Sequence, residues 1–252
     1  MSAGWIAIVG LGPGDANLIT PEVQATLDAA TDIVGYFPYV ARVVERPGLR
    51  LHASDNRVEL ERAAHALAMA AAGQRVVVVS SGDPGVFAMA SAVFEAIEAG
   101  PDDWRGLDLR VLPGITAMLA AAARAGAPLG HDFCAINLSD NLKPWAVIET
   151  RLRLAIQADF AIALYNPRSA SRPEGFVSAL ALMQAEAGDD RLIIFARAVS
   201  TPQESLRVVG LQSATADMAD MRTVVLIGSS QTRQIARANG GAWVYTPRGL
   251  AP

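Results

Sequence analysis

The chain has 252 residues, of which 52% are hydrophobic and 18% charged. This is enough for one large or two small domains and excludes a disordered protein. Its formal net charge of −4 argues against a nucleic-acid partner, because such binding depends mainly on neutralising phosphates with basic side chains. No apolar stretch is long enough to cross a membrane and no basic leader precedes the first predicted strand, so we expect a cytoplasmic protein.

The first half of the chain alternates short apolar runs with alanine-rich helical patterns. These patterns predict strands at 5–10, 32–35, 75–80 and 107–112, and helices at 21–30, 58–72, 86–99 and 115–125. Thr20 is a typical N-cap and Pro21 a typical first helical residue, so they mark the start of the first helix. Strands that alternate with helices indicate a parallel sheet covered by helices.

The second half begins after a turn-rich segment, AGAPLGHD (125–132), where we place a domain boundary between residues 127 and 128. Beyond it the pattern predicts strands at 133–138, 160–165 and 191–198, and helices at 145–157 and 173–185. The β-like runs at 191–199, 205–211 and 223–228 leave no room for helices, which predicts late antiparallel pairing. The predicted fold is therefore α/β, with two domains that each contain a mixed, largely parallel sheet.

Five distinctive loops follow predicted strands, and ligands of open parallel sheets bind at the carboxyl ends of strands. The loops are GLGPGD (10–15), SSGDPGVF (80–87), LPGITAM (112–118), LYNPRSASRP (164–173) and LIGSSQTR (226–233). In the first loop, Asp15 stands where a dinucleotide-binding motif needs its third glycine, which disfavours a nicotinamide or flavin site. Taken singly, each loop also fits a tight turn, a helix start or a solvated loop.

The order and spacing of these loops resemble the tetrapyrrole methylase family, the class III S-adenosylmethionine-dependent methyltransferases. The resemblance covers essentially the whole chain and includes GLGPGDANLIT (10–20), the E-x-x-R of Glu59 and Arg62, SSGDPGVF (80–87), PGITA (113–117) and the late hairpin. It implies a ligand cleft between two α/β domains, S-adenosylmethionine as methyl donor, S-adenosylhomocysteine as product, a tetrapyrrole substrate and a homodimer.

Within the family, three stretches look most like those of precorrin-3B C17-methyltransferases. They are SSGDPGVFAMA (80–90), GAPLGHDFCAINLSDNLKPW (126–145) and ADFAIALYNPRSASRP (158–173). The resemblance implies methylation at C17 with ring contraction to precorrin-4, in cobalamin biosynthesis. Two alternatives stay open: another precorrin or uroporphyrinogen C-methyltransferase of the same family, acting for example at C20 or C11, and a non-catalytic nucleotide-binding module.

Site residues are carried over by position or chosen by chemistry. The resemblance implies donor contacts from Pro13, Gly82, Asp83, Val86, Thr116, Ala117, Tyr165, Asn166, Ala196 and Gly228. A precorrin carries many carboxylates, for which basic side chains are the natural partners; our candidates are Arg57, Lys143, Arg168 and Arg172. Ring contraction needs proton transfer, for which the candidates are Asp55, His131, Asp140 and Tyr165. The sequence contains no pattern typical of metal ligands, so we predict no protein-bound metal.

Overall fold

The computed structural model describes residues 4–55, 58–168, 173–187, 191–238 and 240–249. The chain divides into two compact units, Met1–Thr116 and Ala117–Pro252, and each is described by itself. None of the helices in the described part is long and apolar enough to span a membrane.

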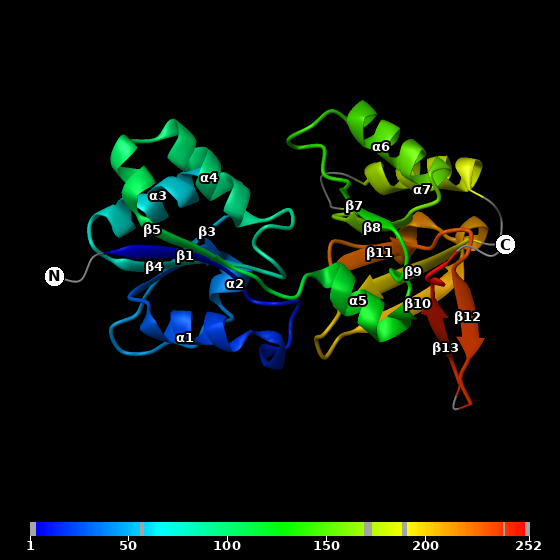
Figure 1. Cartoon of the computed structure of the whole chain (residues 1–252), viewed down its shortest axis with the longest axis horizontal. Helices are drawn as coiled ribbons and strands as arrows, with labels where there is room; N and C mark the ends of the chain where they lie inside the picture. The colour runs from blue at the N-terminus through cyan, green and yellow to red at the C-terminus, as the bar shows by residue number, and fades with distance from the viewer. Residues whose placement is uncertain (1–3, 56–57, 169–172, 188–190, 239, 250–252) are drawn as a thin grey trace. The chain divides into compact units, whose positions relative to one another are not determined.

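The first unit is a parallel five-stranded sheet with helices on both faces (Figure 1). Its strand order is β3-β2-β4-β1-β5. The strands are β1 (Trp5–Gly10), β2 (Asp32–Tyr36), β3 (Arg50–Ser54), β4 (Arg75–Ser80) and β5 (Asp108–Leu112). The helices are α1 (Pro21–Ala29), α2 (Phe37–Val40), α3 (Glu59–Ala71) and α4 (Met89–Ala99).

Alternation along the strands explains the two helical layers of this unit. Ile6 and Ile8 of β1 pack with α3 and α4, whereas Ala7 and Val9 pack with α1. Successive side chains of a strand point to opposite faces, so a strand that is buried on both faces is apolar throughout. The predicted start of α1 is confirmed, because Thr20 accepts a hydrogen bond from the Val23 amide at 3.3 Å and Pro21 follows it.

The second unit contains a mixed five-stranded sheet with the order β10-β9-β11-β8-β7. Its strands are β7 (Phe133–Asn137), β8 (Ala161–Tyr165), β9 (Leu192–Arg197), β10 (Ser205–Gly210) and β11 (Thr223–Ile227). Helices α6 (Trp145–Gln157) and α7 (Gly175–Glu186) cover one face and α5 (Ala117–Ala125) the other (Figure 1).

The α/β class and the late antiparallel strands are confirmed. The second sheet is less parallel than expected, because in the described residues only β7 and β8 pair in parallel. The reason is that β9 and β10 form a hairpin and β11 runs between β8 and β9 in the opposite direction.

A small third sheet, which the sequence did not predict, joins β12 (Arg233–Ala236), β13 (Ala242–Tyr245) and β6 (Gly126–Ala127). Strand β6 lies in the segment expected to be a linker, and α5 belongs with the second unit rather than the first. Ala121 and Ala125 of α5 are buried in the same cluster as Val224 and Val244. The division by contacts therefore falls before α5, at 116/117, whereas the expected boundary of 127/128 falls after it.

Candidate functional site

Three glycines meet where β1, β4 and β5 end, and we call Gly10, Gly82 and Gly114 the glycine cluster. A Cβ atom added to Gly114 would lie 2.2 Å from the Gly82 carbonyl oxygen and 2.7 Å from that of Gly10. A Cβ atom added to Gly10 would lie 2.4 Å from the Gly82 oxygen. Only residues without a side chain permit such close backbone approach. The first three of the predicted loops are therefore packed into one structure at the carboxyl edge of this sheet.

The glycine cluster continues into a short bridge between the first two loops. Gly82 donates to the Gly12 carbonyl at 2.9 Å and Gly12 donates to the Gly82 carbonyl at 3.2 Å. Both residues have positive φ, at 67° and 63°, where glycine carries little strain. Pro13 and Val86, which we expected to contact the donor, are half-buried in these loops.

Asp83 connects two loops rather than capping a helix. Its Oδ1 accepts from the Gly85 amide at 2.8 Å and its Oδ2 from the Gly114 amide at 3.0 Å. Helix α4 begins later, at Met89, and the Ala88 N-cap makes no side-chain cap bond. Asp83 is therefore not the N-cap of α4. A carboxylate offers about four acceptor positions, so two bonds to the backbone leave room for an ammonium group.

Arg42 is a site residue that the sequence did not indicate. Its guanidinium donates to the carbonyls of Leu11, Gly12 and Gly14 in the first loop. No local pattern predicts such contacts, because they join the turn after α2 to a loop far away in the sequence. Arg62 of the E-x-x-R motif acts similarly at the end of β3, where it donates to the Ser54 hydroxyl at 2.8 Å and to the Asp55 carbonyl.

In the second unit, the ends of β7 and β8 bring another group of polar side chains together. Asn166 has a φ of 53° and donates from Nδ2 to the Asn137 side-chain oxygen at 3.0 Å. That oxygen also accepts from the Ser139 amide at 2.9 Å. The Tyr165 hydroxyl accepts from the Met118 amide in the first turn of α5 at 3.0 Å. Asn137 was not among the predicted residues, although it ends β7 as Tyr165 ends β8.

Two of the basic candidates can be placed in this unit. Lys143 is half-buried in the segment after β7 and donates to the Ser139 carbonyl at 3.2 Å. Burial lowers the pKa of Lys143, as does the charge of Arg151, whereas Asp140 raises it. Arg168 follows β8. A hydrogen bond from Thr215 is the main cause of the lowered pKa of Asp217, and the charge of Arg168 also lowers it. The remaining candidates, Arg57 and Arg172, lie outside the described residues.

Ala196 lies at the same edge as Tyr165. Ala196 of β9 pairs with Val224 of β11, and Leu164 of β8 pairs with the next residue, Val225. Because β8 is antiparallel to β11, Tyr165 lies beside Val224, so Ala196 and Tyr165 flank β11 at the same level. Ala196 is buried in the cluster that includes α5.

Gly228 and His131 lie at the opposite edge of the sheet. The Gly228 amide donates to the Leu192 carbonyl at the start of β9, and Ser230 contacts Asp159 just before β8. Because β11 is antiparallel to its neighbours, its carboxyl end lies where they begin. His131 precedes β7 and therefore lies at that same edge. The structure does not bring these two candidates together with Tyr165.

The remaining candidates lie in the first unit, at the start of α5 and after β7, where Asp140 is exposed. Asp55 is exposed directly after β3, at the carboxyl edge of the sheet. Thr116 is buried and is the last residue of this unit, and Ala117 is the first residue of α5.

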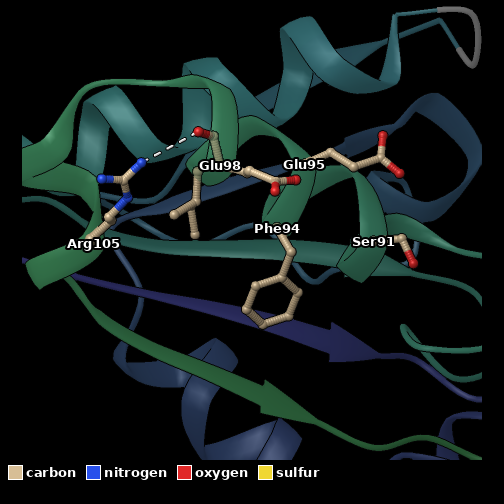
Figure 2. A pocket seen from close by; sticks show the side chains of 6 residues that line it. Ser91, Phe94, Glu95, Glu98 and Arg105 are labelled. Carbon is tan, nitrogen blue, oxygen red and sulfur yellow. Dashed lines mark hydrogen bonds between the residues drawn. The ribbon is translucent and has the colours of Figure 1, made fainter.

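Two surface hollows lie outside all these loops. The first is lined by Ser91, Phe94, Glu95, Ile97, Glu98 and Arg105, from α4 and η2 (Asp102–Gly106) (Figure 2). The second is lined by residues of α6 and α7. Among the described residues, no group of three or more His, Cys, Asp or Glu side chains could hold a metal ion, and the absence of a bound metal stays a prediction.

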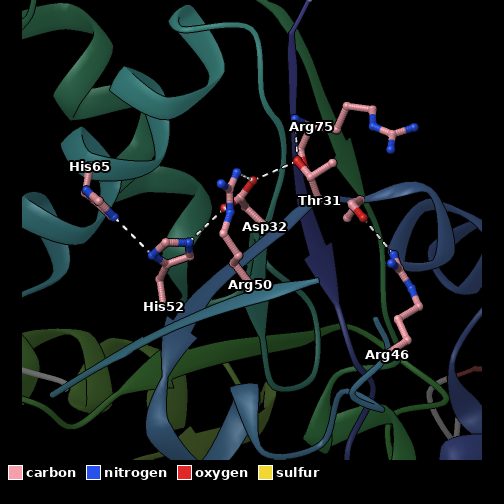
Figure 3. Close-up of polar contacts among 8 residues, drawn as sticks. Thr31, Asp32, Arg46, Arg50, His52, His65 and Arg75 are labelled. Carbon is pink, nitrogen blue, oxygen red and sulfur yellow. Dashed lines mark hydrogen bonds and ion pairs between the residues drawn. The ribbon is translucent and has the colours of Figure 1, made fainter. Parts of the chain in front are cut away.

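A polar cluster lies at the amino edge of the first sheet, where β2 begins (Figure 3). The fully buried Asp32 carboxylate accepts from Arg50 Nε and Nη2, both at 2.8 Å, and lies 2.8 Å from His52 Nε2. Burial raises the pKa of Asp32, but hydrogen bonds from Arg50, Thr31 and His52 outweigh this effect and hold it at about 2. This cluster joins β2 to β3 and is structural.

Comparisons with known proteins point to one family. The sequence profile of Tetrapyrrole (Corrin/Porphyrin) Methylases matches residues 6–215. The chain is 54% identical over 245 residues to the precorrin-3B C(17)-methyltransferase of Sinorhizobium sp, covering 97% of this chain and 96% of that protein.

Solved structures have the same fold. The crystal structure of the methyltransferase CobJ matches with a TM-score of 0.93 and 64% identity, covering 97% of this chain and all of that one. A uroporphyrin-III C-methyltransferase from Thermus thermophilus, complexed with S-adenyl homocysteine, matches in fold with a TM-score of 0.66 at 22% identity, over 89% and 97% of the two chains. The chain therefore belongs to the tetrapyrrole methylase family.

Proposed function

We propose that this chain methylates precorrin-3B at C17, with S-adenosylmethionine as donor, and contracts the ring to precorrin-4 in cobalamin biosynthesis. The observation that carries the proposal is the glycine cluster, which brings three loops of the family pattern into backbone contact at one sheet edge. The 54% identity to a precorrin-3B C(17)-methyltransferase over nearly the whole of both chains supports this substrate and this position of methylation.

The residues of the first unit fit an adenosyl amino acid. Exposed backbone beside glycines lets a ligand approach closely, and the Asp83 carboxylate keeps acceptor capacity for an ammonium group. S-adenosylmethionine supplies an electrophilic methyl group on a sulfonium and leaves as S-adenosylhomocysteine. Pro13, Gly82, Asp83 and Val86 belong to the loops that would hold it.

The chemistry of methylation needs positioning more than reactive side chains. An electron-rich tetrapyrrole carbon is itself the nucleophile: its bond to the methyl carbon forms as the sulfur–methyl bond breaks, and the substrate then loses a proton. Alignment of the reacting atoms can contribute roughly 7–11 kcal/mol in well-oriented cases. The protein therefore needs no nucleophilic side chain for this step.

The second unit supplies groups for the substrate and for proton transfer. Lys143 and Arg168 follow β7 and β8 and would bind substrate carboxylates through charge-assisted hydrogen bonds. The Met118 amide donates to the Tyr165 hydroxyl oxygen, and this bond would stabilise negative charge on that oxygen when the proton is given to the substrate. Tyr165 ends β8 and Asp140 follows the carboxyl end of β7, whereas His131 precedes β7, which favours the first two as acid and base.

We further propose a cytoplasmic homodimer, as the family resemblance implies. The exposed side chains of Ile235 and Trp243 on the β12–β13 hairpin are apolar surface that a second copy would cover. Light scattering of the purified protein tests the dimer. We expect a molar mass twice that of the 26.5 kDa chain, and a monomer at all concentrations would contradict the proposal.

Calorimetric titration with S-adenosylhomocysteine, then with NAD, tests the donor site. We expect micromolar binding of the first and none of the second. Binding of NAD alone would favour a dinucleotide enzyme. Binding of S-adenosylhomocysteine without turnover of precorrin-3B would favour a non-catalytic module or another methyltransferase of the family, and uroporphyrinogen and other precorrins would then be tested.

A further inference from the structure

Arg42 lies in the turn after α2, and its guanidinium is directed onto the loop that follows β1. Nη1 donates to the Gly12 carbonyl at 3.0 Å, and Nη2 donates to the carbonyls of Leu11 and Gly14, the latter at 3.3 Å. This loop has no helix or strand of its own apart from its bridge to Gly82. Backbone carbonyls in such segments need other partners when they are buried, and one side chain provides them here.

The loop is held from two sides. The Gly12 carbonyl accepts from Arg42 and also from the Gly82 amide at 2.9 Å. Arg42 is half-buried, and burial lowers its pKa, but a guanidinium remains charged at neutral pH. Hydrogen bonds from a charged donor are stronger than neutral ones, so Arg42 contributes more to the shape of this loop than a neutral donor would.

We propose that Arg42 is a positioning residue for the methyl donor. It fixes residues 11–14 in their binding conformation before the donor arrives and so determines donor affinity through the loop. The inference rests on the proposed function, because it takes this loop as part of the donor site. A loop that is already ordered loses less conformational freedom when a ligand binds, which increases affinity.

The chain contains a matched control in Arg46, which lies with Arg42 in the segment between α2 and β3. Figure 3 shows the Arg46 side chain. Its Nη2 donates to the carbonyls of Leu27, Asp28 and Ala30, at 3.0, 2.8 and 2.7 Å. Arg46 is also half-buried and also binds three carbonyls, but these lie at the end of α1, next to the amino end of β2. The two arginines therefore share their chemistry and differ in the sheet edge that they stabilise.

The experiment compares Arg42→Ala with Arg46→Ala in the full-length protein, by calorimetry with S-adenosylhomocysteine and by thermal unfolding. We expect Arg42→Ala to raise the Kd at least about tenfold, equivalent to about 1.4 kcal/mol, and Arg46→Ala to change it by less than about twofold. Both should lower the Tm similarly. An unchanged Kd in Arg42→Ala, or an equal rise in both variants, overturns the proposal.

A second variant, Arg42→Lys, keeps the charge but lacks the planar fork of donors, and it tests the idea if Arg42→Ala does not fold. Hydrogen exchange of the unliganded Arg42→Lys variant should be faster than that of wild type in the loop amides of residues 11, 12, 14 and 15, and unchanged in α1. Loop exchange equal to wild type overturns the proposal. If wild type does not bind S-adenosylhomocysteine, the proposed function fails, while the exchange measurement still tests whether Arg42 orders the loop.

Discussion

Replacing Gly114 by alanine tests the glycine cluster directly. The new Cβ atom would lie 2.2 Å from the Gly82 carbonyl oxygen, whereas real Cβ atoms essentially never approach closer than 3.0 Å. All the nearest atoms belong to backbone, so the three loops must separate. Overpacking of this kind costs about 1–3 kcal/mol of folding free energy, which for a chain of this size lowers the Tm by about 2–12 °C.

The same separation should reduce donor affinity. It lengthens the 3.0 Å bond between the Gly114 amide and Asp83, and misplacing binding groups by about 1 Å can cost up to about a hundredfold in activity. We expect calorimetry to show at least about tenfold weaker binding of S-adenosylhomocysteine.

The control is Gly106→Ala, the same substitution in the same unit at a glycine whose added Cβ would meet nothing within 4 Å. This variant should retain wild-type affinity and stability. If Gly114→Ala binds and unfolds like Gly106→Ala, the argument that close backbone contact shapes the site is refuted.

Three further predictions follow from other side chains. Tyr165→Phe removes the acceptor for the Met118 amide and should lower the free energy of unfolding by about 0.5–1.5 kcal/mol, as measured by urea unfolding. The same variant should slow ring contraction more than methylation. Arg168→Ala and Lys143→Ala should raise the KM for the tetrapyrrole while the Kd for S-adenosylhomocysteine stays near wild type. Asp32→Asn should lower the free energy of unfolding at pH 7 by about 2 kcal/mol, because the pKa shift of the carboxyl is worth about 1.4 kcal/mol per unit.

The Asp32 prediction has a definite pH dependence. The folded-state pKa is about 2 and the ordinary value is 3.8, so the carboxylate stabilises the fold above about pH 4 and this contribution is lost between about pH 4 and pH 2. Asp32→Asn should lose less stability than wild type over that interval; an equal loss would contradict the assignment.

The predictions for the other side chains also have contradicting results. Arg207→Ala is the control for Arg168→Ala, because both arginines influence the pKa of Asp217 but Arg207 lies within β10. An equal rise in KM for both variants would show that general charge, and not the position of Arg168, matters. For Tyr165→Phe, unchanged ring contraction would remove Tyr165 from the proton transfer.

The periodic elements of the fold could be predicted from the sequence. Strand β4 and helix α6 match their predicted bounds, 75–80 and 145–157, because buried strands and amphipathic helices have clear apolar patterns. Strand β3 was missed because it is a half-exposed edge strand with Arg50 and His52 in it. Strand β12 is exposed throughout and therefore has no apolar alternation.

The candidate site was predictable only in part, because its loops depend on strand direction and distant contacts. The loops after β1, β4 and β5 meet as expected for parallel strands. The loop after β11 does not join the ends of β7 and β8, because an antiparallel strand ends at the other edge, and this separates Gly228 from Tyr165 and Asn166. Arg42 could not be found from sequence, since its carbonyl partners are defined only by tertiary structure.

The most direct test of the function is to incubate the purified protein with precorrin-3B and methyl-labelled S-adenosylmethionine and to analyse the product by mass spectrometry and NMR. We predict transfer of one labelled methyl group to C17 and a contracted ring. Transfer of the label to another carbon, or recovery of unchanged precorrin-3B from a protein that binds S-adenosylhomocysteine, would contradict the proposed function.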